Sequence, residues 1–538
     1  MSTITATTWV PRGFAAPFPT KYDFNEDEYD RISKLAKLRL DDAKDDLSRA
    51  RDTVEDDQNG SSSGEFGNAG QTATNDKSED LKEYDLENYD KDDESDEAEA
   101  MGMFGNVKSL AYHTSNEEDP YITLKEIEDD DEDREELQIL STDNLLLASR
   151  IEDEVAHLEV YVYEDEADNL YVHHDIMLPA IPLCVEWLDA PVNKANVDKD
   201  SRGSFVAVGT FDPDIEIWDL DIIDCMYPNA ILGQQTGQGP KPKKKKKSKK
   251  TSDEYHVDAV LSLAANRNHR NLLASASADT SVKLWDLNTS QCAKSYSHHS
   301  DKVCSIAWHT ENSTVLLSGS YDRTVVAADL RAPNATVPRW GVESDVESVR
   351  WDPHDPNLFY IATENGIVHH HDARNAPSGP EMSKPIWTLQ AHDEAVSGFD
   401  VNPAIPGFLA TGSTDKEVKL WNVQANGPSL VVSRNPGVGK VFSTNFAPDQ
   451  EVGFRLAVAG SQGAVQIWDT STNAAIRKTF ANRVAPVEGE VEERFVGVED
   501  VGEEDSSDSD PESEGGLAAQ GGEVRSERDG WESMEEDD

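Results

Sequence analysis

The run His369, His370, His371 and Asp372 is the part of the sequence that comes closest to a metal site. Successive side chains of a β-strand point to opposite faces, so only His369 and His371 could bind the same ion. A structural zinc site takes four protein ligands, and no further pair of ligands follows at a suitable spacing. We therefore expect these residues to form an ordinary strand, and we expect no metal and no cofactor.

The segment NPGVGKV (435–441) contains the Gly-Lys pair of a phosphate-binding loop. The motif also needs an earlier glycine, and Arg434 occupies that position. The glycine-rich segment GQQTGQGPKPK (233–243) has the wrong spacing for the same motif, and the HExxH motif of zinc proteases is absent. We therefore predict that the protein is not an enzyme.

The elements around these residues follow a repeat. LLASASADTSVKLWDL (272–287) consists of two strand-like stretches on either side of a turn, which is the pattern of a β-hairpin. A further strand-like run precedes each hairpin, as in KVCSIAWHT (302–310), and a shorter one follows it, as in CAKSYS (292–297) or IRKTFAN (476–482). The hairpin occurs seven times, and the other six copies are residues 145–164, 205–220, 316–330, 359–374, 409–423 and 456–470.

Four strands per copy, with 43 residues from Asp286 to Asp329 and 43 more to Asp372, resemble the WD40 family of β-propellers. The resemblance covers residues 135–485. It implies an all-β fold, a seven-bladed propeller in which each blade buries its faces against its neighbours. Three copies depart from the family pattern, because Tyr163, Ala328 and His371 stand where tryptophan is expected. The sequence does not identify the strand that closes the ring.

The WD40 resemblance also implies roles for the recurring polar residues. Buried polar groups need partners, so a histidine, a serine or threonine, an aspartate and a tryptophan are expected to form a hydrogen-bonded chain that locks each blade. Such residues can also perform catalysis, but we favour the structural role. The residues that we expect to lock the blades are Trp218, Asp219, His256, Ser275, Asp279, Trp285, Asp286, Asp322, His392, Thr411, Asp415, Trp421, Trp468 and Asp469.

The net charge of −56 is concentrated toward the two ends of the chain. Residues 56–134 and 486–538 have too little apolar surface to offset the entropy of folding, so we predict mostly disordered acidic segments there. A short ordered stretch is expected near residues 105–125. Acidic residues follow several serines of these segments, which is typical of acidophilic kinase sites; these serines are Ser95, Ser506, Ser507 and Ser509.

The cysteines and the hydropathy pattern indicate the compartment. The four cysteines form no CxxC pair, so we expect free thiols in a reducing, intracellular environment. The first residues do not read as a signal peptide, and no run of about 18 apolar residues occurs. We therefore expect neither secretion nor a membrane span.

A lysine-rich insertion, residues 234–252, separates the second and third repeats. Nothing in the geometry of a blade requires the run KPKKKKKSKK, so we expect nuclear import receptors or RNA to bind it. A loop that is merely solvated is the simpler alternative. The lysines concerned are Lys243, Lys244, Lys245, Lys246, Lys247, Lys249 and Lys250.

Residues 1–24 read as an extended arm outside the repeats, rich in aromatic residues and proline. An amphipathic helix is predicted over residues 25–55, opened by a capping box of Asn25 and Glu28. Both segments need a surface to lie on, either the propeller or a partner protein. The arm residues expected to dock are Trp9, Pro11, Arg12, Phe14, Phe18 and Tyr22.

Together with the repeats, these outer segments resemble the periodic tryptophan protein family, which are nucleolar WD40 proteins. The likeness rests on the WVPRG arm, on AYHTSNEEDPYITL (111–124), on the lysine-rich insertion and on the acidic end. It implies a scaffold for assembly of the large ribosomal subunit, with pre-ribosomal RNA, ribosomal proteins and assembly factors such as Brix-domain proteins as partners. It implies neither a membrane nor a small-molecule substrate.

Two other functions remain open from the sequence. The acidic ends and the basic run also suit a propeller that binds histones or chromatin. The segments ADLR (328–331) and HDAR (371–374) resemble the WDxR signature of ubiquitin-ligase substrate receptors, although both lack its tryptophan.

Overall fold

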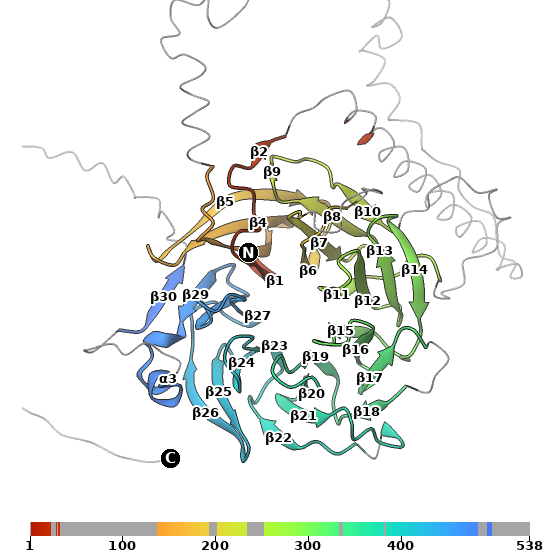
Figure 1. The fold of residues 1–538 in the computed structure, drawn as a ribbon, viewed down its shortest axis with the longest axis vertical. Helices are drawn as coiled ribbons and strands as arrows, with labels where there is room; N and C mark the ends of the chain where they lie inside the picture. Colours follow the sequence, from red (N-terminus) through yellow and green to blue (C-terminus); the bar gives the residue numbers. More distant parts are fainter. Residues whose placement is uncertain are drawn as a thin grey trace, which may run out of the picture. The chain divides into compact units, whose positions relative to one another are not determined.

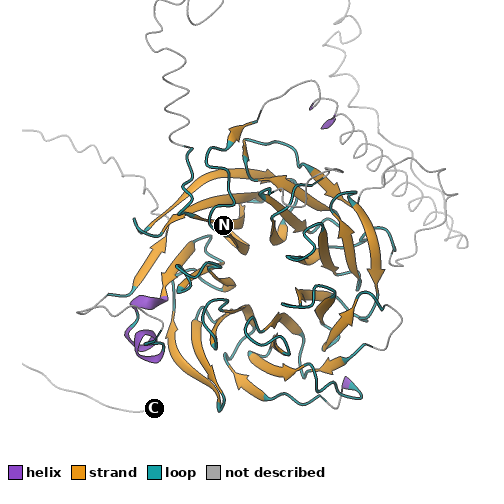
Figure 2. Cartoon of the chain, viewed as in Figure 1, coloured by secondary structure: helices purple, strands orange, loops and turns teal. Residues whose placement is uncertain are grey.

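The computed structural model describes residues 2–22, 28, 31–32, 137–192, 202–233, 252–332, 337–380, 383–482 and 492–497. Seven antiparallel sheets of four strands each surround a central opening (Figures 1 and 2). The predicted seven-bladed β-propeller is therefore confirmed. No helix among the described residues is long and apolar enough to cross a membrane.

Blades three to six each consist of four consecutive strands, ordered from the centre outward. Blade three contains β11 (Val260–Ala265), β12 (Leu272–Ser277), β13 (Val282–Asp286) and β14 (Gln291–Tyr296). Blade four contains β15 (Val303–Trp308), β16 (Val315–Ser320), β17 (Thr324–Asp329) and β18 (Arg339–Gly341). Blade five contains β19 (Val346–Trp351), β20 (Leu358–Thr363), β21 (Ile367–Asp372) and β22 (Trp387–Gln390), and blade six contains β23 (Val396–Val401), β24 (Phe408–Ser413), β25 (Val418–Gln424) and β26 (Gly427–Arg434).

Packing between blades explains the composition of the second strands. All six residues of β24 are buried, because a middle strand has a neighbouring blade against each face. Small residues let the sheets approach closely. A side chain at Gly412 would meet Val441 of blade seven at 2.5 Å, and one at Gly319 would meet Val346 of blade five at 2.7 Å. The hydrophobic core is therefore a ring of clusters between adjacent blades.

Blade two contains β6 (Pro182–Leu188), β7 (Phe205–Thr210), β8 (Ile215–Asp219) and β10 (Ala230–Leu232). A short strand, β9 (Ile222–Ile223), lies between β8 and β10 and pairs in parallel with β2 (Thr20–Lys21). The end of the N-terminal arm is therefore fixed to blade two.

The first blade is built from two distant parts of the chain. Its innermost strand is β1 (Ser2–Val10), which pairs with β3 (Asn144–Glu152); β4 (Val155–Glu164) and β5 (Asn169–Leu178) follow outward. We expected residues 1–24 to lie outside the propeller, so Ser2–Val10 corrects that boundary. The physical reason is strand propensity: STITATTWV is uncharged and rich in β-branched residues, and it supplies the inner strand of blade one.

The seventh blade also differs from the expectation. It contains β27 (Val441–Phe446), β28 (Arg455–Gly460), β29 (Val465–Asp469) and β30 (Arg494–Gly497). Residues 476–482, expected to be its outer strand, lie mostly in the helix α3 (Ala474–Thr479), which follows the 3-10 turn η4 (Thr470–Thr472). The side chain of Asn473 caps this helix by accepting hydrogen bonds from the backbone of Ala475 and Ile476. The propeller therefore extends past residue 485, into the segment predicted as an acidic tail.

A tryptophan at the end of several inner strands ties each blade to the preceding one. The indole Nε1 of Trp308 donates to Ala264 O at 2.9 Å, and that of Trp351 donates to Ala307 O at 3.2 Å. Across the closure of the ring, Trp9 Nε1 donates to Asn445 O at 3.0 Å. The seam between blades one and seven therefore has the same tryptophan-to-backbone hydrogen bond as the boundaries between blades three and four and between blades four and five.

The propeller has two faces, an N-side face and a C-side face. The N-side face carries the loops that lead into the inner strands and the turns between second and third strands. The C-side face lies where the inner strands end. Residues 11–22 cross the C-side face from β1 to the rim of blade two (Figure 1).

Candidate protein-interaction site

Blade three contains a complete hydrogen-bonded chain of the type that the WD40 resemblance implies. His256 Nδ1 lies 3.0 Å from Asp279 Oδ2, and His256 Nε2 lies 2.6 Å from Ser275 Oγ. Trp285 Nε1 donates to the same Ser275 Oγ at 2.8 Å. The chain therefore joins the loop before β11, strand β12, its turn and strand β13.

The order Ser275, His256, Asp279 is that of a serine-protease triad, but the surroundings do not suit catalysis. The histidine side chain is fully buried, and the aspartate side chain is 1% exposed. The serine hydroxyl is already bonded to both the histidine and Trp285. A substrate could not reach it without opening the blade, so these residues stabilise the fold.

Electrostatics keep this chain in one protonation state. Burial lowers the pKa of His256, and the hydrogen bond with Asp279 only partly offsets that effect. Burial alone would raise the pKa of Asp279, but hydrogen bonds with His256 and Ser281 hold it well below its usual range. The aspartate is therefore charged and the histidine accepts no second proton near neutral pH.

Blade six repeats the arrangement, and blade four keeps most of it. His392 lies 2.7 Å from Asp415 Oδ2 and 2.8 Å from Thr411 Oγ1, which also accepts a hydrogen bond from Trp421 Nε1 at 2.9 Å. In blade four, His299 lies 3.1 Å from Asp322 and 2.8 Å from Ser318. Because Ala328 replaces the tryptophan there, the chain ends at the serine.

The remaining residues expected to lock blades lie elsewhere. Trp218 and Trp468 are buried, and the structure gives their indole nitrogens no hydrogen-bond partner within its described part. The aspartates that follow the strand tryptophans act in turns at the opposite end of the blade: Asp219 accepts from Asp221 N, Asp286 from Asn288 N, and Asp469 from Ser471 N. These three aspartates, each directly after a strand tryptophan, are therefore not members of the hydrogen-bonded chain that we expected them to join.

The three histidines of blade five are buried, and His370 lies in an aromatic stack on one face of the sheet while His371 stacks on Phe359. His370 stacks on Tyr360, with ring centroids 4.5 Å apart, and contacts Trp387 at 4.9 Å. Neither ring nitrogen of His370 has a hydrogen-bond partner within the described ranges. No group of His, Cys, Asp and Glu side chains in those ranges is arranged to hold a metal ion.

Because His370 is buried without a hydrogen-bond partner among the described residues, we expect it to make the free energy of unfolding fall at acidic pH. One substitution, His370→Phe, isolates its contribution. Burial lowers the pKa of His370 to about 4, so the unfolded chain takes up a proton between pH 6.5 and 4 before the folded chain does. The contribution to stability is full above pH 6.5 and falls as the pH drops toward 4, by about 3 kcal/mol at most. His370→Phe should lose this dependence, so the variant gains stability relative to the parent chain on acidification.

Urea unfolding at several pH values between 7 and 4 measures that difference directly. Comparison with the parent chain is needed because burial raises the pKa of Glu347 to about 7 and of Asp400 to about 6, which changes stability in the opposite direction. Equal pH dependence of the two proteins would contradict the prediction.

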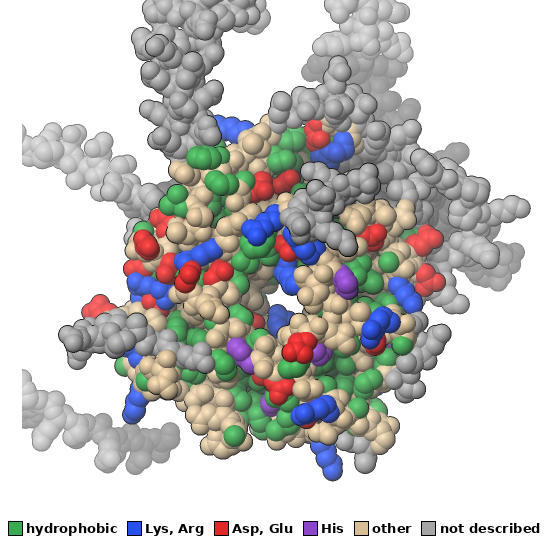
Figure 3. All heavy atoms as spheres, viewed as in Figure 1, with side chains coloured by type: hydrophobic (Ala, Val, Ile, Leu, Met, Phe, Trp, Pro, Cys, Tyr) green, Lys and Arg blue, Asp and Glu red, His purple; other side chains and the backbone are tan. Residues whose placement is uncertain are grey.

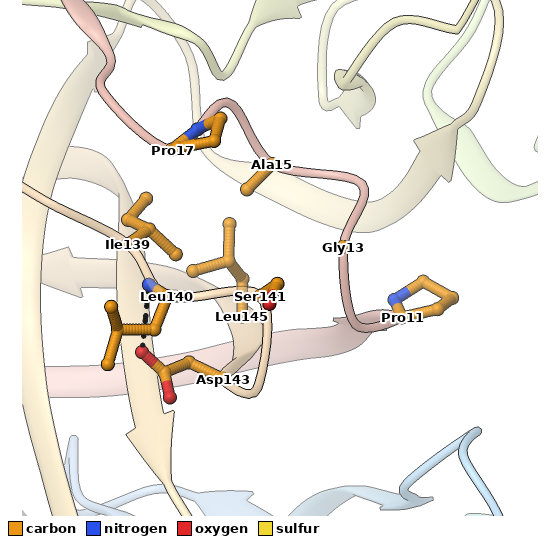
Figure 4. Close-up of a pocket in the computed structure, with 9 residues that line it drawn as sticks. All are labelled: Pro11, Gly13, Ala15, Pro17, Ile139, Leu140, Ser141, Asp143 and Leu145. Carbon is orange, nitrogen blue, oxygen red and sulfur yellow. Dashed lines mark hydrogen bonds between the residues drawn. The ribbon is translucent and has the colours of Figure 1, made fainter.

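The arm residues expected to dock onto a surface are distributed along the propeller itself. Trp9 is buried in β1, and Pro11 borders a small pocket with Ala15, Pro17 and Ile139 (Figure 4). Phe14 packs edge-on against Trp187 at 4.8 Å. These contacts hold the arm against the C-side face of blades one and two, so they leave few arm side chains free for a partner.

The last arm residues reach the rim of blade two. Phe18 is 37% exposed, and Tyr22 donates a hydrogen bond to Glu28 at 2.7 Å. Arg31 pairs with Glu28 and donates to Pro228 O at 2.6 Å. The beginning of the predicted helix therefore contacts the propeller, whereas most of residues 25–55 lie outside the described part of the chain.

Arg12 bridges the two sides of the closing seam. Its Nε donates to Asn144 Oδ1 of blade one at 2.8 Å, and its Nη1 pairs with Glu451 of blade seven at 2.9 Å. Its backbone N–H donates to Asp449 Oδ2 at 3.1 Å. A guanidinium can make such divergent contacts, and a lysine ammonium cannot.

Arg12→Lys should therefore lower the free energy of unfolding by about 1 kcal/mol. Arg331→Lys is the matched control, because Arg331 is exposed and its ion-pair partner among the described residues is Asp329, two residues before it in the chain. Urea unfolding of both variants measures the effect. A control variant as destabilised as Arg12→Lys would mean that the bridge adds nothing specific to the seam.

A second network joins the outer part of the same seam. Arg455 of blade seven pairs with Asp165 of blade one at 2.7 Å and bonds with Tyr163 Oη at 3.1 Å. It also pairs with Asp469, which pairs in turn with Arg494 of β30. Tyr163 therefore replaces the expected tryptophan with a hydroxyl group that serves closure.

The arginines of the two WDxR-like segments fold back on their own aspartates. Arg331 pairs with Asp329 at 2.8 Å, and Arg374 pairs with Asp372 at 2.7 Å. Around the central opening, the visible face carries basic and acidic side chains side by side rather than one sign of charge (Figure 3). The lysines of residues 243–250 and the serines 95, 506, 507 and 509 lie outside the described residues.

The seven-bladed fold and the hydrogen-bonded histidine chains of blades three, four and six together define a WD40-repeat β-propeller. The family described as "WD domain, G-beta repeat" matches residues 248–286, 290–326 and 383–422. These matches fall on blades three, four and six, the blades in which the histidine chain is present.

Similarity over nearly the whole chain identifies the family more narrowly. An uncharacterized WD repeat-containing protein of Schizosaccharomyces pombe is 52% identical over 95% of this chain and 97% of its own length. Periodic tryptophan protein 1 of Saccharomyces cerevisiae is 39% identical over 91% of this chain and 92% of its own, and its Drosophila melanogaster homolog is 30% identical over 89% and 96%. The chain belongs to the periodic tryptophan protein 1 family.

Proposed function

We propose that the protein is a non-catalytic scaffold in nucleolar assembly of the large ribosomal subunit, where it binds pre-ribosomal RNA and other assembly factors. The observation that carries the proposal is the family membership, which extends over 91% of the chain and so reaches beyond the repeats. The nucleolar role is the one that the resemblance to this family implies.

The site geometry supports a scaffold rather than an enzyme. The histidines that could perform catalysis in blades three and six are fully buried, and each is already bonded to its aspartate, so neither is open to a substrate. What the propeller offers instead is a rigid ring with loops on two faces. Ribosomal proteins, Brix-domain proteins and RNA are the partners that we propose for these loops and for the charged segments beyond them.

Sedimentation tests this function without a tag. We expect the full chain in a nuclear extract to migrate with precursors of the large subunit on a sucrose gradient, and to move to the light fractions after ribonuclease treatment. Migration only with free proteins or with fragmented chromatin would contradict the proposal. A deletion of residues 1–55 is not a suitable test, because it removes β1 and with it the inner strand of blade one.

Nuclear import by the lysine-rich insertion is a separate part of the proposal. Replacing Lys243–Lys247, Lys249 and Lys250 with serine should shift the protein from the nucleus to the cytoplasm, because import receptors bind clustered lysines. Fluorescence microscopy of the full chain fused to a fluorescent protein measures the ratio of nuclear to cytoplasmic signal. Unchanged nuclear accumulation would assign import to another segment.

A further inference from the structure

Three exposed apolar residues, Ile181, Phe211 and Val257, lie in the N-side loops of blades one to three, and they are called the apolar patch below. Their side chains are 37%, 59% and 41% exposed. Exposed single apolar residues are common, but these three come from consecutive loops on one face. Ile181 lies in the link from β5 to β6, Phe211 in the turn after β7, and Val257 in the loop before β11.

Backbone contacts place these loops next to one another. Phe211 N donates to Ile181 O at 3.0 Å, which joins the first two. The loop that contains Val257 leads into β11, and the start of β11 packs against blade two. A side chain at Gly209 of β7 would meet Val260 of β11 at 2.9 Å. Residues 210–212 and 257–259 therefore rise from a shared contact between blades two and three, and the rigid blade below fixes their spacing.

The described loops around the patch are acidic. The N-side loops of blades one to three are residues 153–154, 179–181, 211–214, 252–259 and 278–281, and none of them contains lysine or arginine. Seven of their acidic residues lie outside the buried lock of blade three, namely Asp153, Glu154, Asp212, Asp214, Asp253, Glu254 and Asp258. Such a surface repels nucleic-acid phosphates and attracts a cation.

We propose that this patch binds a lysine- and arginine-rich polypeptide segment of another protein, which inserts an apolar side chain between Ile181, Phe211 and Val257. The acidic rim would steer the basic segment and the apolar centre would hold it, which is the usual division between rim and core of an interface. The inference goes beyond the proposed function, and it holds whether or not the partner belongs to a ribosomal precursor.

The chain's own lysine-rich insertion is the competing occupant. It connects Gly233 to Ser252, so both of its ends adjoin these loops, and its charge is complementary. The run KPKKKKKSKK, however, contains no aliphatic or aromatic side chain apart from its proline rings. It could satisfy the acidic rim and would leave the apolar centre uncovered, so a second protein fits the patch better.

Peptide binding to the purified full chain tests the proposal. The probe is a fluorescent peptide of alternating lysine and glycine with one central leucine, and the comparison peptide has glycine in place of the leucine. We expect the leucine peptide to bind at least about tenfold more tightly. Phe211→Ser should weaken that binding about tenfold, and Val257→Ser should weaken it as well, since both side chains are exposed and the fold does not depend on them.

Leu430→Ser is the matched control, because Leu430 is 53% exposed on β26 in blade six, away from the patch. The control should bind the leucine peptide as the parent chain does. Three results would overturn the proposal: equal binding of the two peptides, binding that Phe211→Ser leaves unchanged, or binding that appears only after the insertion lysines are replaced with serine. The last result would mean that the insertion covers the patch.

Discussion

Trp9→Ala should destabilise the protein by about 4 kcal/mol, the cost of removing a large buried aromatic side chain. The indole of Trp9 is 7% exposed, lies edge-on to Tyr163 at 6.1 Å and donates a hydrogen bond to Asn445 of blade seven. The substitution removes packing and an inter-blade hydrogen bond at the seam where blade one meets blade seven. We therefore expect blade one to open before the rest of the ring.

Urea unfolding gives the size of this effect, and amide hydrogen exchange of β1 and β3 gives its location. Phe18→Ala is the control from the same arm, because Phe18 is 37% exposed and its loss should cost about 1.5 kcal/mol, less than half the effect of Trp9→Ala. Similar effects of the two substitutions would contradict the assignment of residues 2–10 to the first blade.

His256→Ala should lower the free energy of unfolding by about 4 kcal/mol, because it leaves the charged Asp279 buried without its main partner. Ser275 would also lose a hydrogen-bond partner, although it would still accept from Trp285. Removing the buried charge as well should recover part of the loss. The double variant with Asp279→Ala is therefore expected to be less destabilised than the sum of the two single variants.

His269→Ala supplies the control for that experiment, since His269 is an exposed histidine of the same blade. It should change stability by no more than about 0.5 kcal/mol. Strictly additive effects of His256→Ala and Asp279→Ala would show that the two side chains do not act as a unit. A protein that keeps its full stability after His256→Ala would contradict the structural role of the lock.

The repeats could be predicted from the sequence because their signals are local. In blade three, alternating small and apolar residues, the turn at Asp279 and the tryptophan at 285 lie within one hairpin of a few residues per strand. The same signals recur in blade six. Four histidine-lock positions there, His392, Thr411, Asp415 and Trp421, could be assigned from the WD40 family pattern, and the structure places them in one hydrogen-bonded chain.

Closure of the ring could not be predicted, because its pairing is not local. Ser2 pairs with Glu152 and Val10 pairs with Leu145, and no short-range pattern sets the register of strands so far apart in the chain. For this reason the sequence favours a separate arm over residues 1–24, although Ser2–Val10 form the inner strand of blade one. The uncharged, β-branched composition of STITATTWV was the available signal, and it favoured a strand.

The outer strand of blade seven was misplaced for a similar reason. IRKTFAN has the composition of a short strand, but the cap at Asn473 and the packing of Ile476 and Phe480 on one side favour a helix. The true outer strand, β30, is four residues long and follows a charged stretch, so its sequence gives little periodicity to detect.

Affinity purification of the full chain, tagged at its C-terminal end so that β1 is left intact, tests the proposed function most directly. RNA sequencing and mass spectrometry of the purified material should recover precursor RNA of the large ribosomal subunit together with nucleolar assembly factors. Recovery of histones or ubiquitin-ligase subunits without that RNA would contradict the proposed function, and the propeller with its closing strand would stand unchanged.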